Sequence, residues 1–172
     1  MKQKFYINVL ASIFVLLIFG ISNTQASNGD DALEEMEIKG IAFDQRTQSP
    51  VLLLTDKEQN SVIPIWIGLC EARSIELSLS DIVPPRPLTY DMIAAIIRTL
   101  NAEVDRIVIV DLRDEVYYAQ LELSVDGKVS KIDVRPSDAL ALASRMNSPI
   151  FVKKSVLQKA ALLNSDQEKR GL

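Results

Sequence analysis

Residues 133–143, DVRPSDALALA, predict the point at which a strand ends and a helix begins. Pro136 suits the first position of a helix, because its missing N–H would have no helical partner there. The alanines and leucines that follow favour a helix and extend it. Asp138 is expected in the first turn, where its carboxylate can accept a hydrogen bond from a free backbone N–H. The stretch therefore predicts a strand-to-helix unit with an acid near the third helical position.

A second stretch, residues 65–72 with the sequence IWIGLCEA, has the same pattern. It passes from β-branched residues through a turn at Gly68 into a helix in which Glu71 is followed by alanine. Glu71 therefore matches Asp138. The similarity indicates a possible internal duplication, in which two related strand-to-helix units are neighbours and both acids lie in first helical turns.

The sequence around these two units predicts a single compact α+β domain with a mixed sheet and about four helices. Segments rich in β-branched residues predict the strands, and apolar residues at helical spacing predict the helices. Asp126-Gly127, between two strand candidates, is a strong hairpin signal. The predicted strands are residues 37–43, 51–55, 62–67, 106–112, 116–125, 129–134 and 150–153, and the predicted helices are residues 69–79, 89 to about 100, 136–146 and 156–163.

The proline-rich segment 81–88 is expected to be irregular, because its three prolines exclude a helix or a central strand. Thr89 follows as a good helix cap. Asp91 would then lie in the first turn, near the positive end of the helix dipole. One apolar face of this helix is predicted from Met92, Ala95, Ile96 and Leu100.

The first 26 residues have the pattern of an export signal. Lys2 and Lys4 precede an apolar run, and Ala26 is a small residue suited to cleavage. We therefore predict an exported protein, periplasmic or secreted, with a mature chain that begins at Ser27. The alternative is an uncleaved membrane anchor, and only in that case is a membrane a partner. The expected organisation is signal peptide 1–26, flexible leader 27–35, domain 36–163 and polar tail 164–172.

Charge and composition limit the possible functions. Without the two lysines of the signal, 17 basic and 23 acidic residues remain, a net charge of −6, which repels nucleic-acid phosphates on average. No histidine occurs, so the commonest general base and transition-metal ligand is missing. Cys70 is the only cysteine, which excludes an intramolecular disulfide; it is predicted to be a small buried residue in a helix.

Residues 133–138 allow two interpretations. In the first, they only start a helix, and Arg135 pairs with Asp138. In the second, they form a site, because capping does not require Asp133, Arg135, Ser137 and Asp138 together. Carboxylates beside a guanidinium can hold Mg²⁺ while the arginine binds a phosphate oxygen, which suits metal-assisted phosphodiester hydrolysis.

Three ordered motifs resemble the bifunctional nuclease (BFN) family. They are residues 63–68 with Glu71-Ala72, residues 86–91 with the sequence RPLTYD, and residues 133–143. The resemblance extends from about Val51 to Ala160. It implies a compact α+β domain, commonly oligomeric, and hydrolysis of both DNA and RNA. Tyr90 stands where the family often has histidine.

The resemblance leads to expected roles for six residues. The candidate metal-binding or base carboxylates are Glu71, Asp91 and Asp138, with Mg²⁺ or Mn²⁺ as the expected ion; Arg86 and Arg135 would stabilise phosphate charge, and Ser137 would orient a ligand or cap its helix. DNA or RNA and further copies of the chain are the expected partners. Two alternatives stay open: a non-catalytic binding or assembly module, favoured by the acidic charge and missing histidine, and hydrolysis of a smaller phosphorylated molecule.

Overall fold

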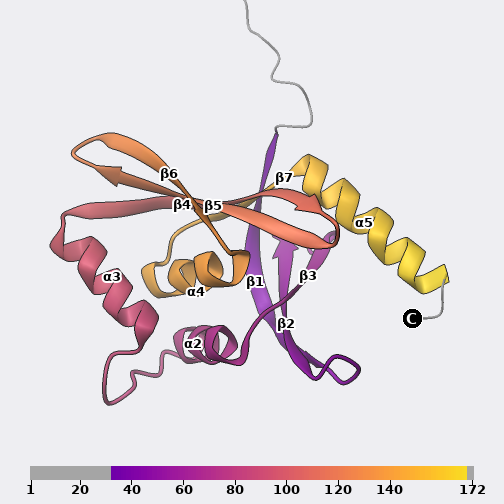
Figure 1. Cartoon of the computed structure of the whole chain (residues 1–172), viewed down its shortest axis with the longest axis horizontal. Helices are drawn as coiled ribbons and strands as arrows, with labels where there is room; N and C mark the ends of the chain where they lie inside the picture. The colour runs from indigo at the N-terminus through magenta and orange to yellow at the C-terminus, as the bar shows by residue number, and fades with distance from the viewer. Residues whose placement is uncertain (1–31, 170–172) are drawn as a thin grey trace, which may run out of the picture.

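The computed structural model describes residues 32–169 and contains a seven-stranded mixed sheet with four helices in that range (Figure 1). The predicted α+β class, with its mixed sheet and four helices, is confirmed. The strands are β1 (Leu33–Asp44), β2 (Ser49–Asp56), β3 (Val62–Trp66), β4 (Ala102–Arg113), β5 (Val116–Val125), β6 (Lys128–Val134) and β7 (Ile150–Lys153). The helices are α2 (Leu69–Leu79), α3 (Thr89–Thr99), α4 (Pro136–Met146) and α5 (Lys154–Lys169).

The sheet has two similar halves on either side of one short central strand. Its order is β3-β2-β1-β7-β4-β5-β6, so each half is a three-stranded antiparallel meander. Strand β7 pairs with β1 in the antiparallel direction and with β4 in the parallel direction. The hairpin signal Asp126-Gly127 is confirmed between β5 and β6, with φ +76° at Gly127. The internal similarity therefore extends beyond the two strand-to-helix units to whole meanders.

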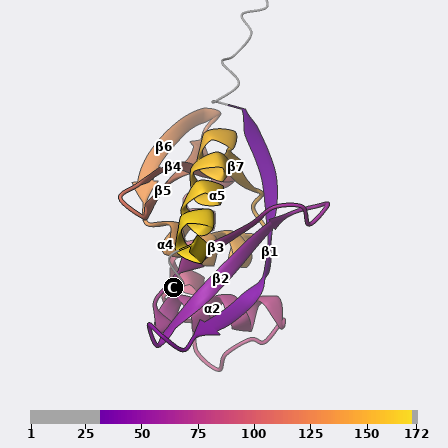
Figure 2. The same ribbon diagram turned by 90° about the vertical axis from the view of Figure 1, so that its right-hand side faces the viewer.

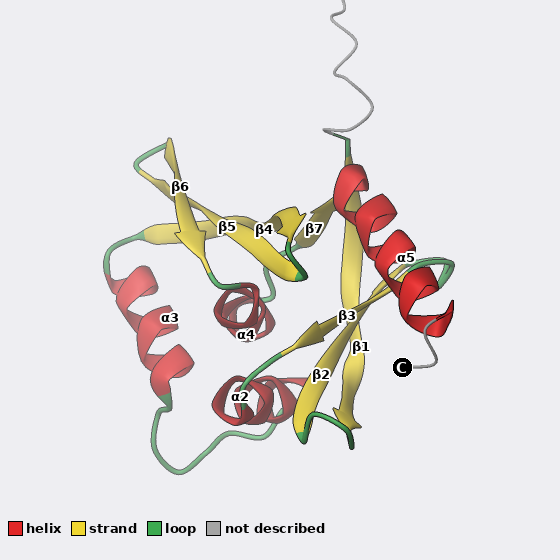
Figure 3. Cartoon of the chain, turned by 45° about the vertical axis from the view of Figure 1, so that its right-hand side comes forward, coloured by secondary structure: helices red, strands yellow, loops and turns green. Residues whose placement is uncertain are grey.

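Each meander ends in an edge strand that leads directly into a helix. Strand β3 leads into α2 and strand β6 into α4; both helices have 11 residues and carry their acid in the first turn. The two helices lie side by side (Figures 1 and 3). They are joined by a hydrogen bond from Ser78 Oγ to the Ser144 carbonyl, 2.6 Å long. The predicted neighbouring units, with Glu71 and Asp138 in first turns, are confirmed.

Helix α4 lies in the angle between the two halves of the sheet, whereas α5 lies on the other side of β1 (Figures 1, 2 and 3). All five side chains of residues 139–143, ALALA, are buried. Alanine at three of these positions lets the helix approach its neighbours closely, while Leu140, with no exposed surface, fills the space between them. The sequence that favours the helix is thus also the sequence that packs it.

The ordered domain is longer at both ends than its predicted limits. Residues 33–35, expected in the leader, belong to β1 and pair with residues 151–153 of β7. Helix α5 begins at Lys154 and runs on to Lys169, into the predicted polar tail. The predicted signal peptide and residues 27–31 of the leader lie outside the described residues. Within residues 32–169, no helix combines the length and apolar character needed to cross a bilayer.

Two predictions about helix starts are wrong. Cys70 is exposed, because the second position of α2 faces solvent. Thr89 is not the cap of α3: Leu88 holds that position, and its backbone N–H donates to Asp91 Oδ2 over 2.8 Å. Asp91 does lie in the first turn, as predicted.

The predicted apolar face of α3 points to solvent. Met92, Ile96 and Leu100 are 50–64% exposed, and the buried residues are Tyr90, Ala94 and Ile97. The reason is a contact that periodicity cannot show. The Tyr90 hydroxyl bonds to α4, which turns the side of α3 that carries Tyr90 toward the core.

Candidate functional site

Arg135 joins the first turns of α2 and α4. Its Nη2 donates to Glu71 Oε1 over 2.9 Å and to Asp138 Oδ1 over 2.8 Å, and its Nε donates to Asp138 Oδ2 over 2.6 Å. Arg135 is the residue just before α4, with an extended backbone, so its side chain can reach both helix ends. The guanidinium is nevertheless accessible, because the side chain is 70% exposed. The predicted pairing of Arg135 with Asp138 is confirmed.

Tyr90 brings a third helix to the same carboxylate. Its hydroxyl donates to Asp138 Oδ1 over 2.6 Å, and Tyr90 is the second residue of α3. Burial, together with this hydrogen bond to Asp138, raises the pKa of Tyr90, so the phenol keeps its proton at neutral pH. Both oxygens of Asp138 therefore accept from side chains. We call Glu71, Tyr90, Arg135 and Asp138 the site cluster.

Glu71 is the most buried carboxylate of the site cluster. Its side chain is 11% exposed. The carboxylate folds back over Gly68, the residue that precedes α2, and its Oε2 occupies the space that a Cβ at position 68 would need. Any larger residue at position 68 would have to move this carboxylate. Gly68 therefore leaves room for the Glu71 carboxylate. The sequence pattern predicted only that Gly68 forms a turn.

The site cluster formally carries two carboxylates and one guanidinium. Burial works to raise the pKa of Asp138, but the hydrogen bonds from Arg135 and Tyr90 outweigh it and hold the pKa below its ordinary value. The hydrogen bond and charge of Asp138 in turn raise the pKa of Arg135. Asp138 is therefore ionised at neutral pH and holds the arginine in place.

A cleft of about 470 Å³ opens beside the site cluster. Both edge strands of the sheet contribute to it, since Trp66 ends β3 and Val134 ends β6. Arg135 and Ser137 form part of its wall, and Glu71 and Asp138 lie behind Arg135. Ser137 is buried at the second position of α4. Arg135 is thus the member of the site cluster that lines this cleft.

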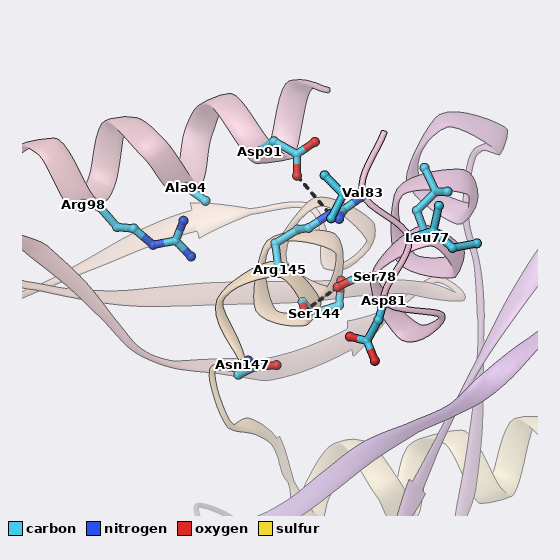
Figure 4. Close-up of a pocket in the computed structure, with 11 residues that line it drawn as sticks. Leu77, Ser78, Asp81, Val83, Asp91, Ala94, Arg98, Ser144, Arg145 and Asn147 are labelled. Atoms are coloured by element: carbon cyan, nitrogen blue, oxygen red, sulfur yellow. Dashed lines mark hydrogen bonds and ion pairs between the residues drawn. The ribbon is translucent and has the colours of Figure 1, made fainter. Parts of the chain in front are cut away.

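Asp91 and Arg86 lie outside the site cluster. Asp91 Oδ1 is 3.3 Å from Arg145 Nε, and the pair lines a different pocket of about 290 Å³ (Figure 4). In that view Asp91 points to Arg145, below α3, while Arg98 reaches in from the same helix. Arg86 is exposed in the loop before α3, and within residues 32–169 it makes no hydrogen bond or ion pair.

The expected divalent-metal ligands are not gathered into one group. Among the described residues, no three His, Cys, Asp or Glu side chains lie close enough together to hold a metal ion. Glu71 Oε1 and both oxygens of Asp138 already accept hydrogen bonds from a guanidinium, so Arg135 stands where a cation between the two acids would bind. The donor set as placed does not fit Mg²⁺ or Mn²⁺, which need several free oxygen ligands.

Of the six residues with expected roles, the structure brings Glu71, Arg135 and Asp138 into contact and places Ser137 in the adjoining cleft, whereas Asp91 and Arg86 lie elsewhere. The sequence patterns gave no role to Tyr90. Tyr90 was noted only as a difference from the related family. The available signal was its position, one residue after a helix start and next to an acid, as at Ser137-Asp138. Its partner is 48 residues away in the chain, and local spacing cannot reveal such a contact.

Comparisons with known proteins agree with the resemblance seen in the motifs. The sequence model of the Bifunctional nuclease domain matches residues 52–165. An uncharacterized protein of Mycobacterium tuberculosis strain H37Rv is 41% identical over 133 residues, which are 77% of this chain and 79% of the relative. Bifunctional nuclease 1 of Arabidopsis thaliana is 27% identical over 107 residues, 60% of this chain but 33% of the plant protein. Bifunctional nuclease 1 of Oryza sativa subsp. indica is 23% identical over 116 residues, 66% of this chain and 35% of its own length.

Proposed function

The chain belongs to the bifunctional nuclease domain family, and from this premise we propose that it hydrolyses phosphodiester bonds of DNA and RNA in the cleft beside Arg135. The observation that carries the proposal is the state of the Arg135 guanidinium. Nε and Nη2 are used by Glu71 and Asp138, whereas Nη1 has no hydrogen bond among the described residues. The two N–H groups of Nη1 therefore remain as donors to a phosphate, on a side chain whose orientation is already fixed.

Each member of the site cluster has a proposed part. Arg135 binds a non-bridging phosphate oxygen and stabilises the negative charge that develops there. Asp138, held by the Tyr90 hydroxyl, keeps Arg135 oriented. Glu71 acts as the base: it takes a proton from water as the water oxygen bonds to phosphorus, the bond to the leaving sugar oxygen breaks, and that oxygen takes a proton from solvent. Glu71 suits this part because Arg135 bonds to its Oε1 and leaves Oε2 on the side of Gly68, which lines the cleft.

The remaining expected residues have smaller parts in this proposal. Ser137 is placed to orient the phosphate from the start of α4. Asp91 acts through its pair with Arg145, away from the reacting atoms. A contact of Arg86 with substrate stays a prediction. The requirement for Mg²⁺ or Mn²⁺ also stays a prediction, because Arg135 already occupies Glu71 Oε1 and both oxygens of Asp138.

The test is an activity screen with purified residues 27–172. Single- and double-stranded DNA, RNA and bis(p-nitrophenyl) phosphate are each offered with Mg²⁺, with Mn²⁺ and with a chelator. Arg135→Met should lower kcat/KM by about a hundredfold or more, because removing one donor to a developing anion has effects of that size. Arg73→Met is the matched control: Arg73 is also exposed and also pairs with an acid three residues on, but it lies outside the cleft.

Two outcomes of the screen would reject the nuclease proposal. A wild-type preparation that is inert on DNA and RNA in all three conditions would favour the non-catalytic binding or assembly module. Activity on small phosphodiesters alone would favour the smaller substrate, for which a net charge of −6 in the mature chain matters less. If Arg73→Met lost as much activity as Arg135→Met, the proposal that hydrolysis takes place in the cleft beside Arg135 would be rejected.

Export and assembly are tested separately. Mass spectrometry of native protein should find an N-terminus near Ser27, and an intact Met1 on membrane-bound material would support the anchor instead. Formation of a homo-oligomer stays a prediction from the family resemblance; light scattering of the purified chain measures it directly.

A further inference from the structure

We propose that the cleft beside Arg135 is a base-binding subsite for single-stranded nucleic acid, in which Trp66 is the stacking surface. This inference rests on the proposed phosphodiester hydrolysis and names its substrate class. It is carried by the aromatic side chains of the cleft, which the hydrolysis of a phosphate does not itself require. Base stacking on exposed aromatic rings is the common way in which proteins bind unpaired nucleotides.

Trp66 is exposed and held in one orientation. It is 45% exposed at the end of an edge strand, which is unusual for so large an apolar residue. Its indole N–H donates to Asp44 Oδ2 over 3.0 Å, and the other oxygen of Asp44 accepts the backbone N–H of Arg46 over 2.8 Å. The hydrogen bond from Trp66 is the main reason that the pKa of Asp44 is lowered far below its ordinary range. The polar edge of the ring is therefore fixed while much of its surface stays free.

Trp66 and Tyr117 separate two adjoining clefts. Both residues line the cleft beside Arg135, and both line a second cleft of about 300 Å³ to which Arg46 contributes. Each cleft thus has an arginine, and the two clefts share an aromatic wall. A strand that crosses this wall would place bases against the rings and phosphates toward Arg135 and Arg46.

Tyr118 also lines the first cleft, but its ring is already covered. The guanidinium of Arg113 lies 4.0 Å from the centre of this ring. Tyr117 is half-buried, and burial raises the pKa of its hydroxyl to about 12, so it remains a neutral phenol. Trp66 is therefore the aromatic residue of the cleft with the most accessible ring and the one assigned to stacking.

Two acids in the lining of the cleft favour bases over phosphates beside them. Glu115 and Asp133 are exposed carboxylates in its lining and would repel a phosphate. Carboxylates accept hydrogen bonds from exocyclic amino groups of bases, such as N4 of cytosine. In a duplex the base faces are stacked and the pairing edges are occupied, so they cannot reach Trp66 and these acids together. The arrangement selects unpaired bases.

The experiment uses the fluorescence of Trp66, which is the only tryptophan in the sequence. Wild-type residues 27–172 are mixed with a short oligodeoxycytidylate and read in a stopped-flow instrument before hydrolysis proceeds. The same measurement is made with an abasic strand of equal length and with a duplex of equal length. The oligodeoxycytidylate should quench the fluorescence, and the abasic strand and duplex should leave it nearly unchanged.

A variant pair tests the ring itself by anisotropy of a labelled oligodeoxycytidylate. Trp66→Leu should weaken binding about tenfold, the size of one base stack. Phe43→Leu should bind as the wild type does, because Phe43 is a comparably exposed aromatic, 50% against 45%, that lines neither cleft. Circular dichroism of both variants confirms that they are folded.

Several results would overturn the subsite. Equal quenching by the abasic strand would show that only the phosphate backbone binds, and equal affinity of Trp66→Leu and wild type would remove the stacking role. A wild-type chain that hydrolyses double-stranded DNA without binding the oligodeoxycytidylate would reject the subsite and leave the proposed hydrolysis standing. A chain that neither binds nor hydrolyses would reject both.

Discussion

Within residues 32–169, two clusters contain a buried glutamate that meets an arginine, and they are built differently. In the site cluster, Arg135 is shared by two carboxylates that come from two helices. In the second, which we call the sheet cluster, Glu122 on β5 is shared by two cations on the neighbouring strands. Arg106 Nε is 2.7 Å from Glu122 Oε2, and Lys131 Nζ is 3.1 Å from Oε1.

The two clusters differ in which charged group keeps unused hydrogen-bond donors and in how exposed that group is. In the sheet cluster the buried acid, with a side chain 8% exposed, is saturated by cations, and Arg106 also stacks over Phe151 at 5.8 Å. In the site cluster the arginine is in the middle, is largely exposed and keeps the donors on Nη1 free beside a cleft. An ion pair alone is therefore a poor sign of a site. Unused donors on a fixed side chain, facing a cleft, are a better one.

The largest expected effect comes from exchanging each buried glutamate for its amide. Glu71→Gln should lower nucleic-acid hydrolysis by about a thousandfold, because an amide cannot take a proton from water. Glu122→Gln should leave kcat nearly unchanged and lower the free energy of unfolding by about 1–3 kcal/mol, because a hydrogen-bonded charge in the sheet is lost. Enzyme assays and urea titrations measure the two effects. If Glu122→Gln lost as much activity as Glu71→Gln, the two clusters would not differ in function.

Gly68→Ala should have the next largest effect. The new methyl group needs the space of the Glu71 carboxylate, which must then move relative to Arg135. Activity should fall about a hundredfold, as expected when a reacting group is displaced by about 1 Å. Leu69→Ala, at the adjacent and exposed position, serves as the control. Activity of Gly68→Ala at the wild-type level would show that the position of Glu71 does not matter for the reaction.

Tyr90→Phe should have a moderate effect, because it removes the hydroxyl that holds Asp138 and keeps the ring. The loss of one hydrogen bond to a charged group should cost about 1.5–3 kcal/mol of stability. Since that bond helps to lower the pKa of Asp138, the pKa should rise in the variant, and NMR titration of the carboxyl carbons measures it. Tyr117→Phe is the control, because the hydroxyl of Tyr117 has no hydrogen bond among the described residues. A pKa of Asp138 that stays the same in Tyr90→Phe would contradict the arrangement.

Acid sensitivity is the smallest expected effect, and the two clusters should share it. The pKa values of Asp138 and Glu122 are both lowered in the folded protein. For Asp138, burial opposes the bonds from Arg135 and Tyr90, and for Glu122 the bond from Arg106 is the main cause. A carboxyl whose pKa is lower in the folded state than in the unfolded state, where it is about 4, stabilises the folded protein at higher pH. This stabilisation is lost as the pH falls through the pKa of the folded state. Unfolding titrations below about pH 5 should show a shallower decline in Asp138→Asn and in Glu122→Gln than in the wild type.

Local features of this fold could be predicted, and long-range ones could not. Both helices of the strand-to-helix units were predicted with the bounds observed, because Gly68 and Pro136 mark the turns and the apolar spacing that follows is helical. The orientation of α3 was missed, since it depends on a bond from Tyr90 to a residue on another helix. The joining of Glu71 to Arg135 was suggested only through the internal similarity of the sequence.

The meeting of Trp66 with Tyr117 in one cleft had no signal in the sequence. These residues lie on opposite halves of the sheet, and the sheet bends so that both halves reach the same cleft. Bending of a sheet is decided by the packing of whole layers, and neither residue pattern nor spacing specifies it. The exposed residues Met92, Ile96 and Leu100 of α3 illustrate the same limit. Helical spacing predicts an apolar face but not the element against which that face packs.

The central strand β7 also determines the order in which the molecule can be completed during synthesis. Strand β7 has four residues, 150–153, and follows both meanders in the chain. Until β7 leaves the ribosome, the edges of β1 and β4 that pair with it are unpaired. Both meanders then carry an exposed edge strand. Strand β7 then joins the two meanders and adds to the contact between α2 and α4 that holds both walls of the cleft in place.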